Sequence, residues 1–112
     1  MGTLQIGSTA RIELDDMELE QLRVAMGVKL RCREMFAVSW TEQTQRGASE
    51  QSVLVGPGQP LLFSFDSCER PKTDRARVGE LLGAASTLSG MRIETSPKPV
   101  RRSTRTDVGA AR

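Results

Sequence analysis

The sequence predicts an α+β fold of two layers, in which two helices lie on one face of an antiparallel sheet in the order ββ-α-βββ-α-β. Two segments, about 15–33 and 74–88, carry apolar residues at helical spacing. The segments around and between them are short and alternate apolar with polar residues, which is the period of a half-buried strand. Because these strand-like segments follow one another through short connections, antiparallel neighbours are favoured.

The chain opens with a predicted β-hairpin. Leu4 and Ile6 alternate with polar residues, and Ile12 and Leu14 repeat the pattern after the Gly7-Ser8 pair. Glycine tolerates the positive φ that a tight hairpin turn requires. The pattern therefore predicts two paired strands with one buried face.

The first helix is predicted from both of its ends. Asp15 or Asp16 can cap it, and Glu18 is placed to complete a capping box. Basic residues lie at the other end, where they complement the negative end of the helix dipole: Lys29, Arg31 and Arg33. Apolar residues between the ends predict a buried stripe: Leu19, Leu22, Met26 and Leu30.

Three strands are expected next, at 35–40, 52–55 and 61–65, arranged as an antiparallel meander. The polar stretch 41–51 shows no alternation and is predicted to be a loop. The stretch 56–60 combines glycine with proline and predicts a turn between the second and third of these strands.

The second helix is predicted to begin at Thr73 or Asp74, because either side chain can cap it. Its apolar residues recur at helical spacing: Val78, Leu81, Leu82, Ala85 and Leu88. Gly90 stands where an αL C-cap would end the helix. Met91 and Ile93 are expected to form a final edge strand.

The folded domain is expected to span residues 1–95 and to be followed by a disordered basic tail, residues 96–112. The tail contains two prolines and almost no large apolar side chain, so it offers little to bury. It holds five basic residues and one acidic residue, whereas the whole chain has a formal net charge of +2. The folded part is therefore mildly acidic.

The composition excludes several kinds of chemistry. The chain has no His and no Tyr, so His-based catalytic triads and imidazole metal sites are excluded. Cys32 and Cys68 lie far apart in the sequence and are expected to be reduced thiols in a cytoplasmic protein. No metal site and no cofactor is expected. No stretch has the pattern of a signal peptide or the length of an apolar membrane span.

Basic residues define a candidate nucleic-acid surface. It combines the end of the first helix with the tail: Lys29, Arg31, Arg33, Lys98, Arg101, Arg102 and Arg105. Contacts from such residues to phosphates would be non-specific and would weaken with salt. The alternative is that these charges serve only the helix end and the solubility of the tail. Trp40 could stack on a base, but it shares a face with Phe36 and Val38 and is expected in the core.

Several segments resemble a family of small actinobacterial proteins of unknown function that are often labelled ATP-dependent DNA ligase. The matching residues are spread over the folded part: IELDD at 12–16, KLR at 29–31, Phe36, Ser39-Trp40, Pro60-Leu61, Phe63, Phe65, Pro71, Arg75-Ala76, Glu80, Leu81, Ala85 and Gly90. The chain departs from the family pattern at 53–57 and at 74–77, where members carry an aromatic- and histidine-containing run and an Asn-Arg-Ala-Trp run. The resemblance supports the α+β prediction.

The ligase label implies a lysine that becomes adenylated within a K-x-D-G motif. The nearest stretch here is Lys72-Thr73-Asp74-Arg75, in which arginine stands in place of glycine. The sequence favours the alternative, in which Thr73 and Asp74 only cap a helix. We therefore predict a non-catalytic domain that binds a protein partner, with a nucleic-acid-binding accessory protein as the alternative. The identity of the partner and the oligomeric state stay open.

Overall fold

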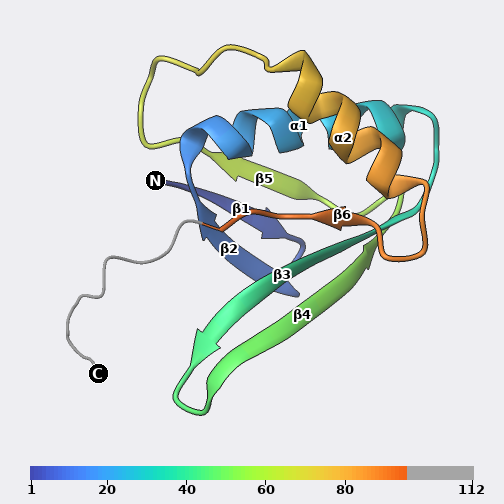
Figure 1. Ribbon diagram of the computed structural model, residues 1–112. Helices are drawn as coiled ribbons and strands as arrows, with labels where there is room; N and C mark the ends of the chain where they lie inside the picture. Colours follow the sequence, from blue (N-terminus) through green and yellow to red (C-terminus); the bar gives the residue numbers. More distant parts are fainter. Residues whose placement is uncertain (96–112) are drawn as a thin grey trace.

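Six strands and two helices follow one another in the predicted order ββ-α-βββ-α-β in the computed structural model, which describes residues 1–95 (Figure 1). The strands are β1 (Gly2–Ile6), β2 (Ala10–Leu14), β3 (Phe36–Thr44), β4 (Gly47–Val55), β5 (Leu61–Ser64) and β6 (Met91–Arg92). The helices are α1 (Asp16–Arg31) and α2 (Arg75–Ala85). The predicted α+β class is confirmed, whereas the predicted tail lies outside the described residues.

The strands form two three-stranded sheets, in the orders β2-β1-β5 and β4-β3-β6, and not one sheet as predicted. The expected meander is also wrong, because β5 pairs with β1 and not with β4. Leu4 lies opposite Phe63 in this pair, and the Gly7 N–H donates to the Pro60 carbonyl at 2.8 Å. The turn between β4 and β5 thus carries the chain from one sheet to the other.

The last strand, β6, runs parallel to β3, so the second sheet is mixed and not purely antiparallel. Gly90 makes this approach possible. It has a φ of +74°, and a Cβ on it would lie 2.1 Å from the Ala37 carbonyl oxygen. Gly90 is therefore not the helix C-cap that the sequence predicted, since α2 ends at Ala85 and Ser86 caps it.

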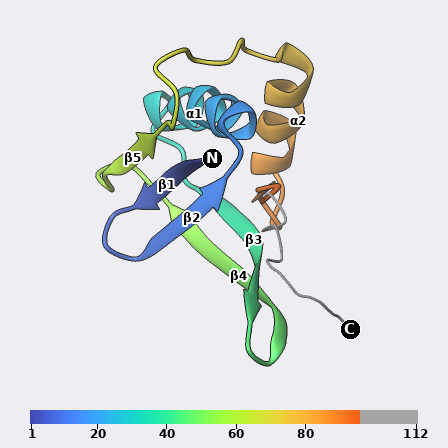
Figure 2. The same ribbon diagram turned by 90° about the vertical axis from the view of Figure 1, so that its left-hand side faces the viewer.

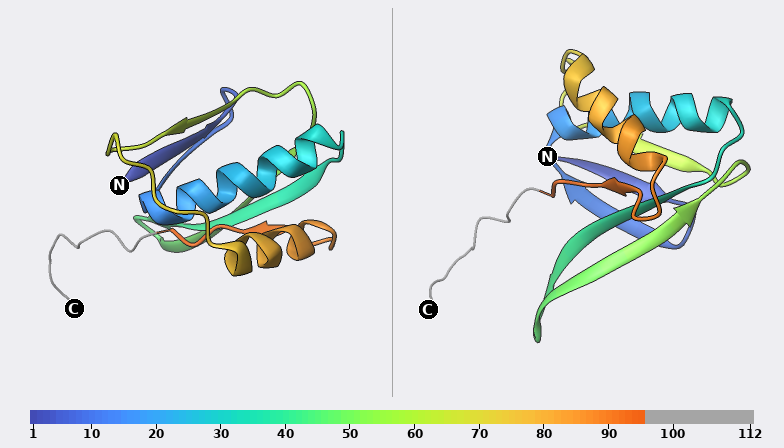
Figure 3. Two further views of the ribbon diagram at one scale, coloured as in Figure 1. Left: turned by 90° about the horizontal axis from the view of Figure 1, so that it is seen from above. Right: turned by 45° about the vertical axis from the view of Figure 1, so that its right-hand side comes forward.

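The core lies between the inner faces of the two sheets and beneath the helices. Figures 2 and 3 show both helices on the same side of the strands; α1 contacts β1 and α2, and α2 contacts β6 and β3. The largest fully buried apolar side chains come from both sheets and both helices: Leu4, Ile6, Leu14, Leu19, Leu22, Met26, Leu81, Met91, Val38 and Val55. The alternation seen in the sequence is confirmed for these strands. Phe63 and Phe65 are only half-buried against this core.

Both helix N-caps follow the sequence prediction. The Asp15 carboxylate accepts from the Met17 N–H at 3.1 Å, and the Asp74 carboxylate accepts from the N–H groups of Ala76 and Arg77. Within residues 1–95, neither helix is long and apolar enough to cross a membrane. Cys32 and Cys68 are both exposed and unbonded.

Candidate functional site

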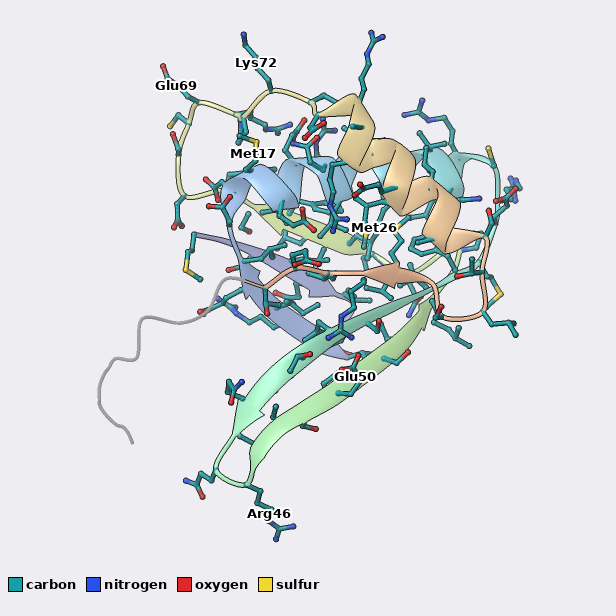
Figure 4. The ribbon with its side chains drawn as sticks, viewed as in Figure 1. Met17, Met26, Arg46, Glu50, Glu69 and Lys72 are labelled. Atoms are coloured by element: carbon teal, nitrogen blue, oxygen red, sulfur yellow. The ribbon has the colours of Figure 1, made fainter. Side chains whose placement is uncertain are left out.

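The β3–β4 hairpin is longer than the sequence predicted, because the expected loop at 41–51 is a paired ribbon. The two strands stay in register from the Phe36–Val55 pair to the Thr44–Gly47 pair. We call residues 36–40 and 51–55 the root of this hairpin and residues 41–50 the arm. The arm projects away from the rest of the chain, with Arg46 at its tip (Figures 1 and 4).

A groove of about 310 Å³ lies between the β1–β2 hairpin and the place where the arm leaves the root. Its lining residues come from both hairpins: Thr9, Ala10, Arg11, Trp40, Glu42, Gln51, Ser52 and Val53. The Trp40 indole N–H donates to the Glu42 carboxylate at 3.2 Å. Only 5% of Trp40 is exposed, so the core assignment is confirmed and the residue does not offer a stacking platform.

The outer edge of β4 borders this groove, and among residues 1–95 no second strand pairs with it. Thr44 and Gly47 flank a two-residue turn and form the closing pair of the ladder. In an antiparallel pair, alternate residues direct their backbone groups toward the partner strand. The backbone groups of Ala48, Glu50, Ser52 and Leu54 therefore point away from β3, toward the free edge.

Among residues 1–95 the β4 edge is also the longest edge, and it carries few blocking residues. β4 has nine residues, no proline and one charged residue, Glu50. In the first sheet, one edge strand is β2, which has five residues and carries the exposed charges of Arg11 and Glu13. β5 and β6 have four and two residues. Natural proteins usually block a long edge with charges, proline or bulges, and this edge has little of that protection.

The outer face of the second sheet carries a network of polar contacts. The Arg92 guanidinium donates to the Glu50 carboxylate and to the Thr41 hydroxyl, and that hydroxyl donates to Glu50 at 3.2 Å. These contacts join β6, β3 and β4 and compensate the one charge on the β4 edge. Leu54 lies on the same face and is 64% exposed.

Of the candidate nucleic-acid residues, three lie within the described part of the chain, at the end of α1. The Lys29 ammonium donates to Glu34 at 2.8 Å and its side chain is only 15% exposed, so it serves the end of α1. Arg31 and Arg33 are exposed. Arg33 has a φ of +60° and donates its N–H to the Leu30 carbonyl, which ends the helix. Lys98, Arg101, Arg102 and Arg105 lie outside the described residues.

Lys72 lies in the loop before α2, and its exposed side chain points outward (Figure 4). A residue that the sequence analysis missed, Gln21, holds this loop. Its side chain is 1% exposed, donates to the Lys72 carbonyl at 3.0 Å and accepts from the Asp74 N–H at 2.6 Å. Nothing in the periodicity of the sequence separates Gln21 from a solvent-facing helical residue, because its partners lie about fifty residues away.

A second polar cluster ties the helices to the strand that follows them. The Arg77 guanidinium donates to Glu18, to Glu80 at 3.2 Å and to the Arg92 carbonyl at 3.1 Å. The hydrogen bonds that the Arg77 guanidinium donates to the Glu18 carboxylate raise the pKa of Arg77 above its ordinary value. Glu18 therefore serves this cluster, and the predicted capping box does not form. Among the described residues, no group of His, Cys, Asp or Glu side chains is arranged to hold a metal ion.

Comparison with known proteins gives one match. A family model described as "Domain of unknown function (DUF7882)" matches residues 1–96. No curated protein and no solved structure matches the chain. The match covers the same part of the chain as the resemblance seen in the sequence, and it attaches no activity to it.

Proposed function

We propose that this chain, which belongs to the DUF7882 family of unknown function, is a non-catalytic domain that binds a protein partner by adding a strand to β4. The observation that carries the proposal is the nine-residue edge of β4 beside the groove, with which no other strand of residues 1–95 pairs. An extended segment that adds to a sheet edge gains a row of main-chain hydrogen bonds at once. Few other surfaces of a small domain offer so many unpaired backbone groups in one line.

The two faces of the second sheet would then distinguish one added strand from another. Side chains of an added strand point alternately to the two faces of the sheet. Those on the inner face would meet the groove, which offers Arg11, Gln51 and the carboxylate of Glu42. Those on the outer face would meet Leu54 and the Glu50–Arg92 pair. Main-chain hydrogen bonds would supply affinity, and these side chains would supply selectivity.

The proposed lack of catalysis extends to the ligase label of the resembling family. The Lys72-Thr73-Asp74-Arg75 stretch lacks the glycine of a K-x-D-G motif, and Asp74 is occupied as the cap of α2. We place the protein in the cytoplasm, where the exposed thiols of Cys32 and Cys68 would stay reduced. Incubation with radioactive ATP should leave no covalent label on the chain. A label that disappears in Lys72→Ala would contradict this part of the proposal.

The alternative is a nucleic-acid accessory protein that uses the basic tail together with Arg31 and Arg33. Its support is the concentration of basic residues after residue 95 and the exposure of these two arginines. Fluorescence anisotropy with duplex DNA tests it. Binding that falls steeply with added salt and disappears without residues 97–112 would favour this role over strand addition.

Two matched lysine substitutions test the strand-addition proposal. Leu54 on β4 and Leu62 on β5 are both exposed apolar residues, at 64% and 57%, but they lie on different sheets. Leu54→Lys places a charge at the β4 edge, a common natural block to edge pairing. In quantitative affinity capture from a cell extract, Leu54→Lys should recover about tenfold less of a partner of the β4 edge than the unmodified protein does. Leu62→Lys should recover as much of it as the unmodified protein.

Hydrogen exchange provides the second measurement. Amides that face the free edge, those of Ala48, Glu50, Ser52 and Leu54, should become protected when a captured partner is bound. Protection of these alternate residues is the signature of an added strand. A partner that binds the two lysine variants equally, and leaves these amides exchanging as before, would show that β4 is not the docking edge.

A further inference from the structure

We infer that the strand that adds to β4 is the β4 strand of a second copy of this chain, antiparallel and centred on Gln51. The inference rests on the proposed strand addition and names its occupant. Three features of β4 support it: the pattern of residues that would face one another, the direction of the backbone groups at its outer edge, and the exposure of the outer arm, residues 42–48, in one copy.

The sequence of β4 is complementary to itself in one antiparallel register. With Gln51 opposite the Gln51 of the second copy, Glu50 faces a serine, Ser52, and Ala48 faces Leu54. The exposed leucine is then covered by a small apolar residue, and the carboxylate meets a hydroxyl. A shift by two residues in one direction places the two Glu50 side chains opposite each other, which is destabilising. A shift in the other direction places Glu50 opposite Leu54.

The directions of the backbone hydrogen-bonding groups fit the same register. The residues whose N–H and C=O groups point to the free edge are Ala48, Glu50, Ser52 and Leu54. In the register centred on Gln51, these residues face one another in the pairs 48–54 and 50–52. Both members of each pair thus direct their hydrogen-bonding groups toward the other strand. The two copies are related by a two-fold axis through Gln51, the commonest symmetry of soluble oligomers.

The pairing would also support the outer part of the arm, residues 42–48, which is exposed in one copy. All residues from Glu42 to Ala48 are exposed, and a two-stranded ribbon without a packed face is marginally stable in water. The antiparallel register lays the arm of each copy beside the root of the other, where Val53 and Val55 pack against the core. The two mixed sheets would join into one continuous sheet, and neither copy would keep a free β4 edge.

The charges at this edge allow two copies to approach. Glu50 is the one charged residue of β4, and the guanidinium of Arg92 already compensates it. Figure 4 shows Glu50 at the middle of the hairpin and Arg46 at its tip. In the proposed register, the tip of each arm reaches the Gly56–Pro57 turn of the other copy, which carries no charge. No like charges therefore stand directly opposite each other along the added strand; the two Glu50 side chains lie diagonally on one face, and each is compensated by the Arg92 of its own copy.

Cysteine cross-linking tests the register directly. In a chain with Cys32→Ser and Cys68→Ser, Gln51→Cys places a thiol on the proposed two-fold axis. Directly opposed strand residues have Cα atoms about 4.5–5.5 Å apart, which lies within the range of a disulfide. The control is Ser49→Cys, whose two thiols would be displaced by about 13 Å along the strands. We expect rapid oxidation to a covalent dimer for Gln51→Cys and little for Ser49→Cys. Equal cross-linking, or none for either, would overturn the inference.

Sedimentation velocity of the full chain tests the pairing without cysteines. Residue 52 of each copy faces Glu50 of the other, so the dimer contains this pair twice. Ser52→Lys would place opposite charges at both pairs, and Ser52→Glu would place like charges at both. At low salt we expect the dimer dissociation constant to fall by about tenfold for the first variant and to rise by a similar factor for the second. Leu54→Lys should also weaken the dimer, whereas Leu62→Lys should not.

These measurements separate the inference from the proposed function. A chain that stays monomeric at all concentrations, but loses a captured partner with Leu54→Lys, would overturn self-pairing and leave strand addition in place. A dimer that is unaffected by Ser52→Lys, Ser52→Glu and Leu54→Lys would overturn self-pairing through β4, since its interface would lie elsewhere.

Discussion

The root and the arm of the β3–β4 hairpin are one continuous ladder, yet they depend on different interactions. In the root, Phe36, Val38 and Trp40 are buried on the inner face, and Val55 is fully buried opposite Phe36. In the arm, the side chains are polar or small on both faces, and nearly all of them are exposed. The backbone pairing is the same along both parts, so only the packing of the side chains changes.

The comparison shows that a strand can extend beyond the pattern that predicts it. Alternation appears in a sequence where one face of a strand is buried. Once the root has brought the two strands into register, each further residue pair is added to an existing ladder. Such a pair needs less side-chain packing of its own. The arm is therefore a paired ribbon without any alternation, and its free edge is available to another chain.

The largest expected effect is in the root. Phe36 is 3% exposed and lies at the base of β3, so Phe36→Ala should lower the free energy of unfolding by about 3–5 kcal/mol. Urea denaturation followed by Trp40 fluorescence measures it. A loss below about 1 kcal/mol would mean that the root packs no better than the arm, because surface substitutions usually stay within such limits.

The second effect tests the contact that holds β6 against the root. Gly90→Ala would place a Cβ 2.1 Å from the Ala37 carbonyl oxygen, whereas at Gly58, which also has a positive φ, a Cβ would meet nothing within 4 Å. Gly58→Ala should cost about 1–2 kcal/mol from backbone strain alone. Gly90→Ala should cost about 1–3 kcal/mol more, because the neighbouring strand must move. Equal losses of thermal stability in the two variants would show that this close approach adds nothing to the root.

A smaller effect concerns the Glu20–Arg23 ion pair of α1 and the way its contribution to stability depends on pH. The Arg23 guanidinium donates to the Glu20 carboxylate at 2.8 and 2.9 Å and lowers the pKa of Glu20 below its ordinary value of 4.5. Because the folded state prefers the charged form, this contact stabilises the protein above about pH 4.5, and the stabilisation is lost as the pH falls through the lowered pKa.

The variant Glu20→Gln measures this contact. At pH 7 it should be a few tenths of a kcal/mol less stable than the unmodified chain, since Arg23 is partly exposed to solvent. The difference should shrink as the pH is lowered below 4.5, because the protonated carboxyl then resembles the amide. Denaturation curves at a series of pH values check the sign. A difference that grows in acid would contradict the assigned contact.

The smallest expected effect is in the arm. Gln43 is exposed and lies opposite Ala48, beyond every buried residue of β3. Gln43→Ala should change the free energy of unfolding by no more than about 0.5 kcal/mol. A loss of 2 kcal/mol or more, measured by the same denaturation as for Phe36→Ala, would show that the arm packs against something in the folded protein and would remove the distinction between root and arm.

The sequence alone determined the local structure of this protein. The caps at Asp15 and Asp74, the order of the elements and the buried alternation of residues such as Leu4, Ile6 and Val38 were all predictable. Each depends on the spacing of neighbouring residues along the chain: a helix end needs an acceptor within three residues, and a buried strand face repeats every second residue.

The tertiary structure decided what depends on contacts between distant residues. It assigned β5 to β1 and made β6 parallel to β3, so that one expected sheet became two. It extended the arm, and it buried Gln21 against the loop before α2. The physical reason is that strand pairing and the burial of a polar side chain depend on which surfaces meet in space, and local periodicity carries no information about the partner. The free β4 edge arises in the same way, since an edge exists only where the fold places no neighbour.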